Sequence, residues 1–123
     1  MPFPVDEREI EAAEQALRRR FPAAMRNRLS LSNGGEIEVA GDDCGWFLYP
    51  VRDATTRKRL SRTCNDIVRE TRLAREWARF PNGAVAIADN GCGDHLVLLP
   101  GSDDIHFWDH ESGELSAETI DWG

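Results

Sequence analysis

The sequence predicts an α+β domain in which helices pack against a largely antiparallel sheet of about five to six strands. Apolar residues recur at spacings of three and four over much of residues 6–79, which is typical of amphipathic helices, whereas most strand-like runs follow residue 84. Helical and strand segments that are segregated along a chain favour an antiparallel sheet over a doubly wound parallel one. At 123 residues the chain fits one domain, 1–123.

Two helices are expected at the start of the chain. The first covers about 6–20, because Ile10 and Leu17 share one face and three arginines near its end complement the helix dipole. Pro22 opens the second helix, which carries Met25 and Leu29 toward the core. We expect this helix to end at the turn-forming run Asn33-Gly34-Gly35.

A hairpin and a long helical stretch are expected next. Alternating polar and apolar residues over 36–39 and aromatic residues over 46–49 predict two paired strands. Asp53 then serves as the N-cap of a helical stretch that reaches about Arg79 and is interrupted near Asn65.

The remaining residues read as strands. Continuous apolar runs over 84–88 and 96–99 predict two central strands that are buried on both faces. Turn residues separate them from a strand over 105–109 and from a short last strand near Leu115.

Charge is distributed unevenly along this acidic chain, whose net charge is −7. All fifteen basic residues lie at or before Arg79, and nine acidic residues follow residue 82. We therefore expect no direct nucleic-acid partner but a protein with a basic surface, although a solvated acidic rim is the simpler alternative. The expected contacts are Asp103, Asp104, Asp109, Glu111 and Glu114, with Trp108 or Trp46 as an aromatic anchor if exposed; Trp77 and Trp108 are expected in the core.

Targeting signals are absent from the sequence. No apolar run approaches the length of a membrane span, and the N-terminus lacks the layout of a signal peptide, so we expect a cytoplasmic protein without a membrane partner. Cys44, Cys64 and Cys92 form no C-x-x-C pair, which predicts free thiols.

Two sets of side chains invite a catalytic hypothesis. On a strand His106, Trp108 and His110 would share a face, where Asp94 or Asp109 would add oxygen ligands for a metal, but the spacing matches no established site. Cys92 lies three residues before His95, without an identifiable orienting group or oxyanion pocket. We expect no catalytic residues, no metal and no cofactor, and a small metal- or thiol-dependent hydrolase stays an open alternative.

The succession of motifs resembles the SUKH superfamily, the Smi/Knr-type domain. The resemblance rests on Glu14 and Leu17, the Phe21-Pro22 break, Asn33-Gly34-Gly35, Phe80-Pro81-x-Gly83, Asn90-Gly91-x-Gly93-Asp94 and Trp108-Asp109-His110-Glu111. Many members continue into a C-terminal helix, whereas residues 116–123 follow here, so we expect a short member or an altered terminal contact.

The resemblance implies an α+β domain without enzymatic activity. Bacterial members are mostly immunity proteins that bind and neutralise a cognate toxin, often a nuclease or deaminase, and eukaryotic relatives serve as scaffolding or regulatory modules. It further implies that the shared motif residues form the scaffold, while contact residues vary with the toxin. The scaffold residues are Asn33, Gly34, Gly35, Pro81, Gly83, Gly91, Gly93, Asp94 and Trp108.

Overall fold

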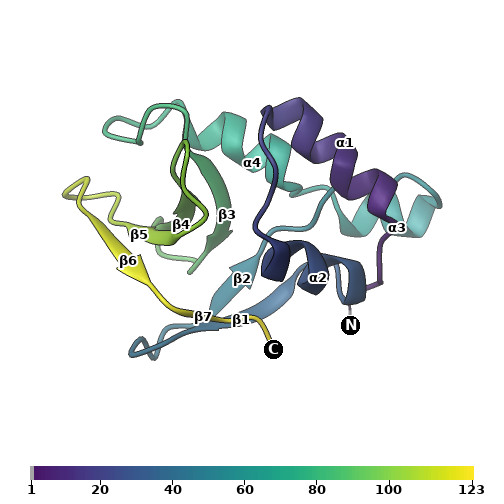
Figure 1. The fold of residues 1–123 in the computed structure, drawn as a ribbon, viewed down its shortest axis with the longest axis horizontal. Coiled ribbons are helices and arrows are strands. Elements are labelled where there is room, and N and C mark those ends of the chain that lie inside the picture. Colours follow the sequence, from purple (N-terminus) through teal and green to yellow (C-terminus); the bar gives the residue numbers. More distant parts are fainter. Residues whose placement is uncertain (1) are drawn as a thin grey trace.

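A seven-stranded antiparallel sheet with four helices forms the structure, a computed structural model that describes residues 2–123 (Figure 1). The strands lie in the order β6-β5-β4-β3-β2-β1-β7. Their bounds are β1 Gly35–Val39, β2 Trp46–Leu48, β3 Val85–Asp89, β4 His95–Leu98, β5 Ile105–Trp108, β6 Leu115–Glu118 and β7 Ile120–Asp121. This confirms the predicted α+β class, with one strand more than the upper expected number.

The sheet is strongly curled and nearly closed. β6 pairs with β5 at one edge, and β7 pairs with β1 at the other, although only Thr119 separates β6 from β7 in the chain. The carbonyl of Thr119 accepts a hydrogen bond from the Ala40 N–H at 2.9 Å, which ties this crossing to the end of β1. Figure 1 shows the yellow C-terminal segment crossing from one edge to the other.

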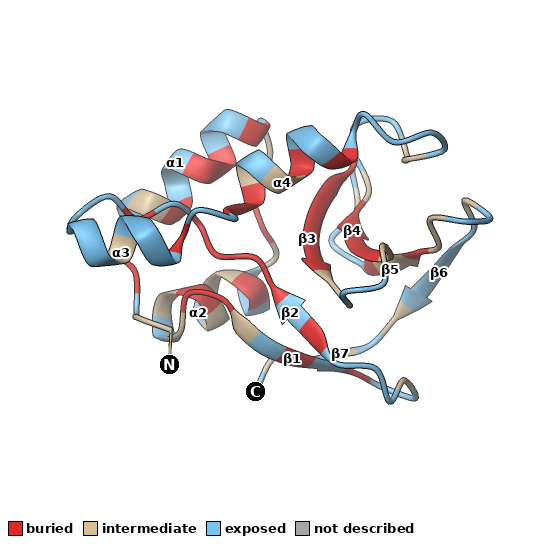
Figure 2. Cartoon of the chain, turned by 180° about the vertical axis from the view of Figure 1, so that it is seen from behind, coloured by how far each residue is buried: buried red, intermediate tan, exposed pale blue. Residues whose placement is uncertain are grey.

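Helices cover one side of the curled sheet. α1 (Glu7–Leu17) and α4 (Ile67–Ala74) lie side by side, and α4 packs on β3, as Figures 1 and 2 show from opposite sides. α2 (Ala23–Leu31) contacts α1 and lies near the start of β1, and α3 (Arg57–Arg62) lies at the far end. Buried Glu14 joins α1 to α2, because its carboxylate accepts from the Phe21 N–H at 2.7 Å and from Arg26 at 3.1 Å.

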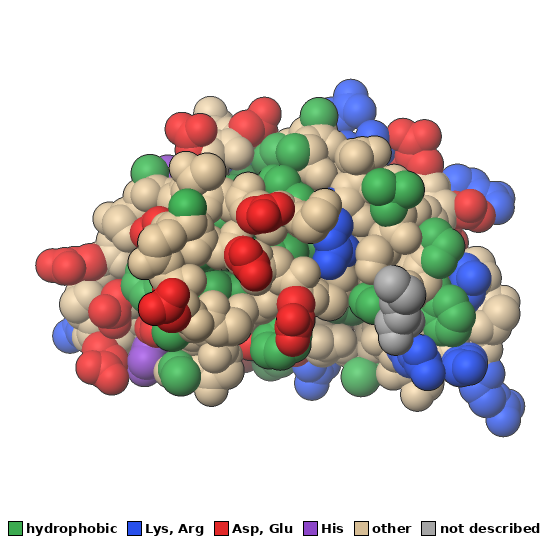
Figure 3. Space-filling view, turned by 90° about the horizontal axis from the view of Figure 1, so that it is seen from below, with side chains coloured by type: hydrophobic (Ala, Val, Ile, Leu, Met, Phe, Trp, Pro, Cys, Tyr) green, Lys and Arg blue, Asp and Glu red, His purple; other side chains and the backbone are tan. Residues whose placement is uncertain are grey.

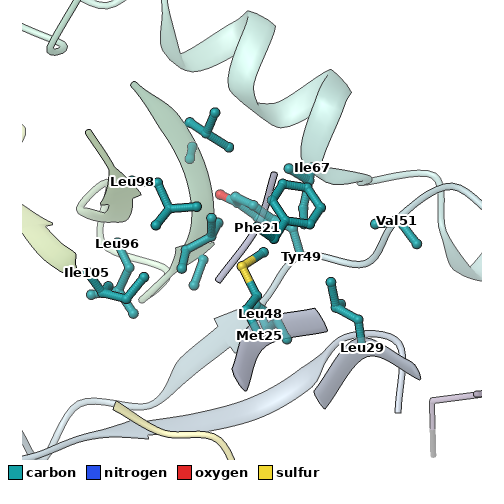
Figure 4. Packing of buried hydrophobic residues seen from close by; sticks show 14 of the residues in the cluster. Phe21, Met25, Leu29, Leu48, Tyr49, Val51, Ile67, Leu96, Leu98 and Ile105 are labelled. Carbon is teal, nitrogen blue, oxygen red and sulfur yellow. The ribbon is translucent and has the colours of Figure 1, made fainter. Parts of the chain in front are cut away.

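β3 and β4 are central and buried on both faces, as predicted. Leu96 and Leu98 of β4 point into the main core, which Met25 and Leu29 of α2 enter from the other side (Figure 4). On the opposite face Val97 packs with Ala84 and Trp108 in a second, smaller cluster. Burial of both faces explains why these strands read as continuous apolar runs.

The helical stretch expected over 53–79 is too long at both ends, but its interruption near Asn65 is confirmed. Only α3 and α4 form within it, and each starts at its own N-cap: Thr56 accepts from the Arg59 N–H, and Asp66 accepts from the Arg69 N–H. Asp53 precedes α3 by several residues and caps the Thr55 N–H of a turn. The side chain of Thr63 accepts from the Asp53 N–H at 3.0 Å, so the segment between the helices is bound to the loop before them.

The first helix is also shorter than expected. It ends at Leu17 because Arg18 adopts the left-handed conformation, with φ 59°, and caps the helix with its N–H. The basic residues 18–20 therefore lie beyond the last turn, and the predicted match with the helix dipole is wrong. Arg19 instead donates to the carbonyl of Leu99 at 3.0 Å.

Candidate partner-binding surface

Three turns lie at the same end of the sheet. Successive connections in an antiparallel meander alternate between its two ends, so the β1–β2 turn (40–45), the β3–β4 turn (90–94) and the β5–β6 turn (109–114) share one end. The β4–β5 turn (99–104) lies at the opposite end.

Acidic side chains gather on these three turns, and we call this set the acidic end. Its carboxylates belong to Asp42, Asp43, Asp94, Asp109, Glu111 and Glu114. Asp42 and Asp94, from different turns, are close enough for the charge of Asp94 to oppose the ionisation of Asp42. In Figure 3 most Asp and Glu side chains lie at the left and centre of the face shown, and most Lys and Arg side chains at the right.

The structure divides the contact residues that the sequence suggested. Asp109, Glu111 and Glu114 belong to the acidic end. Asp103 and Asp104 precede β5 and so lie at the other end of that strand, where Asp103 pairs with Arg19 at 3.1 Å. Asp42 and Asp43 of the β1–β2 turn also belong to the acidic end.

Asp94 connects the β3–β4 turn to the β5–β6 turn. One carboxylate oxygen accepts from the His110 backbone N–H at 3.2 Å and lies 2.7 Å from His110 Nδ1, and the other accepts from Asn90 at 3.1 Å. Gly93 makes the close approach possible, because it has φ 97° and an added Cβ would lie 3.1 Å from the His110 ring. The Gly-x-Gly-Asp motif therefore shapes and joins two turns.

The hydrogen bonds around Asp94 and His110 shift the pKa values of both side chains. Burial alone would raise the pKa of Asp94, but hydrogen bonds from His110 and Asn90 outweigh it and hold that pKa below its ordinary value. The hydrogen bond to Asp94 raises the pKa of His110 above its ordinary value. The β5–β6 turn thus carries a histidine that protonates more readily than a free one, beside a carboxylate that stays ionised.

The other two turns are held by their own aspartates. Asp42 accepts from the Cys44 N–H at 2.8 Å and from the indole of Trp46 at 3.1 Å, and the bond from Cys44 is the main reason that its pKa is lowered. Asp109 accepts from the N–H groups of Glu111 at 2.8 Å and Ser112 at 3.2 Å. Such local capping fixes the backbone that presents the outer carboxylates.

The core position expected for Trp108 is confirmed, whereas the one expected for Trp77 is wrong. Trp108 and Trp46 are both 0% exposed. Either was expected to anchor a partner only if it was exposed, so neither serves as that anchor. Trp108 is held by its indole N–H, which donates to the Arg79 carbonyl at 3.1 Å. Trp77, expected in the core, is 45% exposed, and its ring packs edge-on against His110 with centroids 5.9 Å apart. Trp77 is therefore an exposed aromatic side chain that borders the acidic end.

The other scaffold residues have identifiable roles. The Asn33 amide accepts from the Val51 N–H and donates to the Val51 carbonyl, both at 2.9 Å. Gly35, with φ 88°, lets Pro2 approach, since an added Cβ would lie 2.9 Å from its ring. The carbonyl of Pro81 accepts from the Ala84 N–H in the turn that leads into β3, and Gly83 follows with φ 75°.

The residues of the metal hypothesis are brought together only in part. Asp94, Asp109 and His110 place one ligand atom each within 4.8 Å of one another. β5 ends at Trp108, so His110 lies in the turn and not on the strand with His106, and the shared face expected for these two histidines is wrong. His106 pairs across the sheet with Val97 and Ala117, away from the acidic end.

The suggested thiol–imidazole pair occupies two different environments. Cys92 is exposed in its turn, whereas His95 is buried and packs against Trp77, Phe80 and Trp108. Burial lowers the pKa of His95, so its ring stays neutral near neutral pH. His95 is therefore part of a cluster of aromatic rings, with Trp77, Phe80 and Trp108, beneath the acidic end.

Two cavities have linings that include none of the six carboxylates of the acidic end. A groove of about 820 Å³ runs between α1 and α4, with Ala12, Ala16 and Leu73 among its lining residues. A pocket of about 630 Å³ lies beside Phe3, Phe47 and Arg59. None of the cysteines and histidines considered for catalysis lines either cavity.

The nearly closed antiparallel sheet and its helical layer form a small α+β domain, in which a glycine turn joins neighbouring hairpins. The family model described as the SMI1 / KNR4 family (SUKH-1) matches residues 4–121. The chain belongs to this family, which confirms the resemblance seen in the sequence. Searches of curated proteins and of solved structures gave no match. Among the described residues, no helix has the length and apolar character needed to cross a membrane.

Proposed function

We propose that this protein is a non-enzymatic, cytoplasmic immunity protein that binds a cognate toxin, of the nuclease or deaminase type, through its acidic end. The observation that carries the proposal is the convergence of six carboxylates from three separate turns on one end of the sheet. Membership of a family that includes immunity proteins supports it. The toxin would present a basic surface, such as the cleft with which a nuclease holds nucleic acid.

Charge gives such a surface a kinetic advantage. Opposite charges on two partners speed their encounter and fix their orientation, and salt screens this attraction over about 10 Å at 0.1 M ionic strength. An immunity protein has to bind its toxin before the toxin acts, so a high association rate is the property that the acidic end would supply.

Trp77 supplies the apolar part of the proposed interface. Tryptophan is enriched among the few residues that dominate binding energy, provided that surrounding contacts exclude water from it. The ring of Trp77 is half-exposed, rests on buried Trp108 with centroids 6.2 Å apart, and borders the charged turns. Its support from below would keep it oriented before the partner arrives.

The first test is affinity capture from the lysate of the cells that produce the protein, at low and at raised salt, read by mass spectrometry. The proposal expects one basic protein whose recovery falls as salt rises, and cells that lack the immunity protein should be harmed by that captured protein. Recovery of host regulatory proteins alone, without any protection, would instead support a scaffolding or regulatory module.

A matched pair of variants then locates the interface. Glu111→Gln with Glu114→Gln removes two charges from the acidic end, and Asp103→Asn with Asp104→Asn removes two exposed charges from the opposite end. We expect the first variant to lower the association rate and weaken its salt dependence, while the second behaves like the wild-type protein. Equal effects of both variants would contradict the assigned surface.

A further inference from the structure

Two of the three cysteines lie on neighbouring turns of the acidic end. Cys44 is in the β1–β2 turn and Cys92 is in the β3–β4 turn, and both are exposed. These turns adjoin because β2 pairs with β3, with Phe47 opposite Asp89 as the outermost pair. Cys44 lies three residues before Phe47, and Cys92 lies three residues after Asp89, so the two cysteines are equally far along the chain from this pair.

The paired strands hold the two turns next to one another. The Tyr49 N–H donates to the Ile87 carbonyl at 2.8 Å, and the pairing continues to Phe47 and Asp89, just before the two turns. Neighbouring strands of a sheet lie about 4.8 Å apart. A disulfide spans Cα separations of about 4.4 to 6.8 Å, so adjoining turns on paired strands can be bridged by one.

Both turns present their cysteine in the same way. The Cys44 N–H donates to the side chain of Asp42 at 2.8 Å, and the Cys92 N–H donates to the side chain of Asn90 at 2.9 Å. Gly45 and Gly91, which flank the two cysteines, have open space where a Cβ would lie. The turns can therefore approach one another without displacing packed side chains.

The two thiols also sense each other electrostatically. The pKa of Cys44 is raised, first by its hydrogen bond and proximity to Asp42, then by desolvation, by the Cys92 thiolate and by Asp43. Cys44 is thus less ionised at neutral pH than a free cysteine, which favours Cys92 as the thiol that meets an oxidant first.

We propose that Cys44 and Cys92 form a reversible disulfide that joins the β1–β2 turn to the β3–β4 turn when the protein meets a peroxide. The Cys92 thiolate attacks one oxygen of hydrogen peroxide, the O–O bond breaks, and Cys92 becomes a sulfenic acid as water leaves. The Cys44 thiolate then attacks the Cys92 sulfur, the S–S bond forms, and the S–O bond breaks with release of a second water. The two sulfurs together lose two electrons, which reduce the peroxide. This inference concerns thiol chemistry alone and does not depend on the identity of the partner.

Peptide mapping tests the proposal directly on the whole protein. Cleavage after Lys and Arg places the three cysteines on separate peptides, 29–52, 63–69 and 80–123. After treatment with hydrogen peroxide we expect peptide 29–52 linked to peptide 80–123, a monomer on a non-reducing gel, the loss of two of the three free thiols, and full reversal by dithiothreitol.

Single serine variants supply the control. Cys64 is exposed but lies between α3 and α4, so Cys64→Ser should leave the linked peptide unchanged. Cys44→Ser and Cys92→Ser should each abolish it, and both side chains are exposed, so folding should be retained. Links that include Cys64, dimers only, or thiols at positions 44 and 92 that stay open to alkylation would overturn the proposal.

Discussion

Removal of the Asn33 side chain should destabilise the protein strongly. Asn33 is 7% exposed and Val51 is 0% exposed, and the two are joined by a pair of hydrogen bonds, both 2.9 Å long. In Asn33→Ala the N–H and the carbonyl of Val51 stay buried and lose their partner. The bonds join the end of α2 to the segment after β2.

The size of the effect follows from the two orphaned groups. Leaving one buried polar group without a partner costs about 1 to 3 kcal/mol, so two cost about 2 to 6 kcal/mol. For a domain of this length each kcal/mol lowers the Tm by about 4 °C, which gives a decrease of about 8 to 24 °C. Asn33→Asp keeps the acceptor for the Val51 N–H but not the donor for its carbonyl, so it also destabilises the protein.

Urea and thermal unfolding, followed by circular dichroism, measure this cost. Asn27→Ala is the matched control, because Asn27 is exposed on α2, and its free energy of unfolding should stay within about 0.5 kcal/mol of the wild-type value. If Asn33→Ala changes the free energy of unfolding no more than this control does, the assigned role of Asn33 is refuted.

Three further predictions concern the acidic end. In an NMR titration His110 should show a pKa above its ordinary value and His95 a pKa below it. Asp94→Asn should lower the pKa of His110, because the hydrogen bond to Asp94 is the main cause that raises it. Folding raises the pKa of His110, so the Asp94–His110 pair stabilises the protein fully at pH values below the pKa that His110 has in the unfolded chain. This stabilisation is lost as the pH rises through the pKa of His110 in the folded protein. The difference in unfolding free energy between the wild-type protein and Asp94→Asn should therefore shrink over that range. Gly93→Ala should lower the free energy of unfolding by about 1 to 2 kcal/mol because of its left-handed backbone, and by more if the His110 ring cannot shift. An unchanged free energy of unfolding in chemical denaturation would show that the close approach of Gly93 to His110 is unimportant. Trp77→Ala should weaken binding of the captured partner by more than tenfold, as expected for an anchor worth about 2 kcal/mol. It should also lower the unfolding free energy, because the ring packs on His95, Trp108 and His110. Unchanged affinity of the folded variant in calorimetry would exclude Trp77 from the interface.

Strands that are dictated by local burial could be predicted from the sequence. β3 and β4 are apolar on both faces because both faces are covered, and that pattern is visible without any knowledge of tertiary contacts. β7 consists of two residues, Ile120 and Asp121, and forms only because Val39 and Glu38 at the opposite edge accept it as a partner. No local signal encodes such a pairing.

The failure of the long helix has a similar cause. Leu60 and Cys64 continue the helical spacing of apolar residues into α4, yet both are exposed and α3 buries none of its residues. Spacing reports a possible apolar face but not whether another element covers it. The caps at Thr56 and Asp66 were the better signals, since each opens a new helix.

The sign of the charged surface was visible in the sequence, but its grouping was not. Asp103 and Asp109 are six positions apart and lie at opposite ends of β5, whereas Asp42 and Asp94 are far apart in the chain and lie on neighbouring turns. The alternation of hairpin ends would have revealed this grouping, given the strand order. The burial of Trp108 was expected from the sequence, but the exposure of Trp77 was not.

Each of these turns contains some side chains that hold its backbone in place and others that are exposed to solvent. In the β5–β6 turn the carboxylate of Asp109 binds the backbone N–H of Glu111, while the side chain of Glu111 points to solvent. In the β3–β4 turn Asp94 and Gly93 face His110, while Cys92 is exposed. Because the inward groups fix the backbone, the outward side chains can change their charge or size without altering the turns. A domain built in this way can keep one fold while its exposed surface changes, which the proposed immunity function would require.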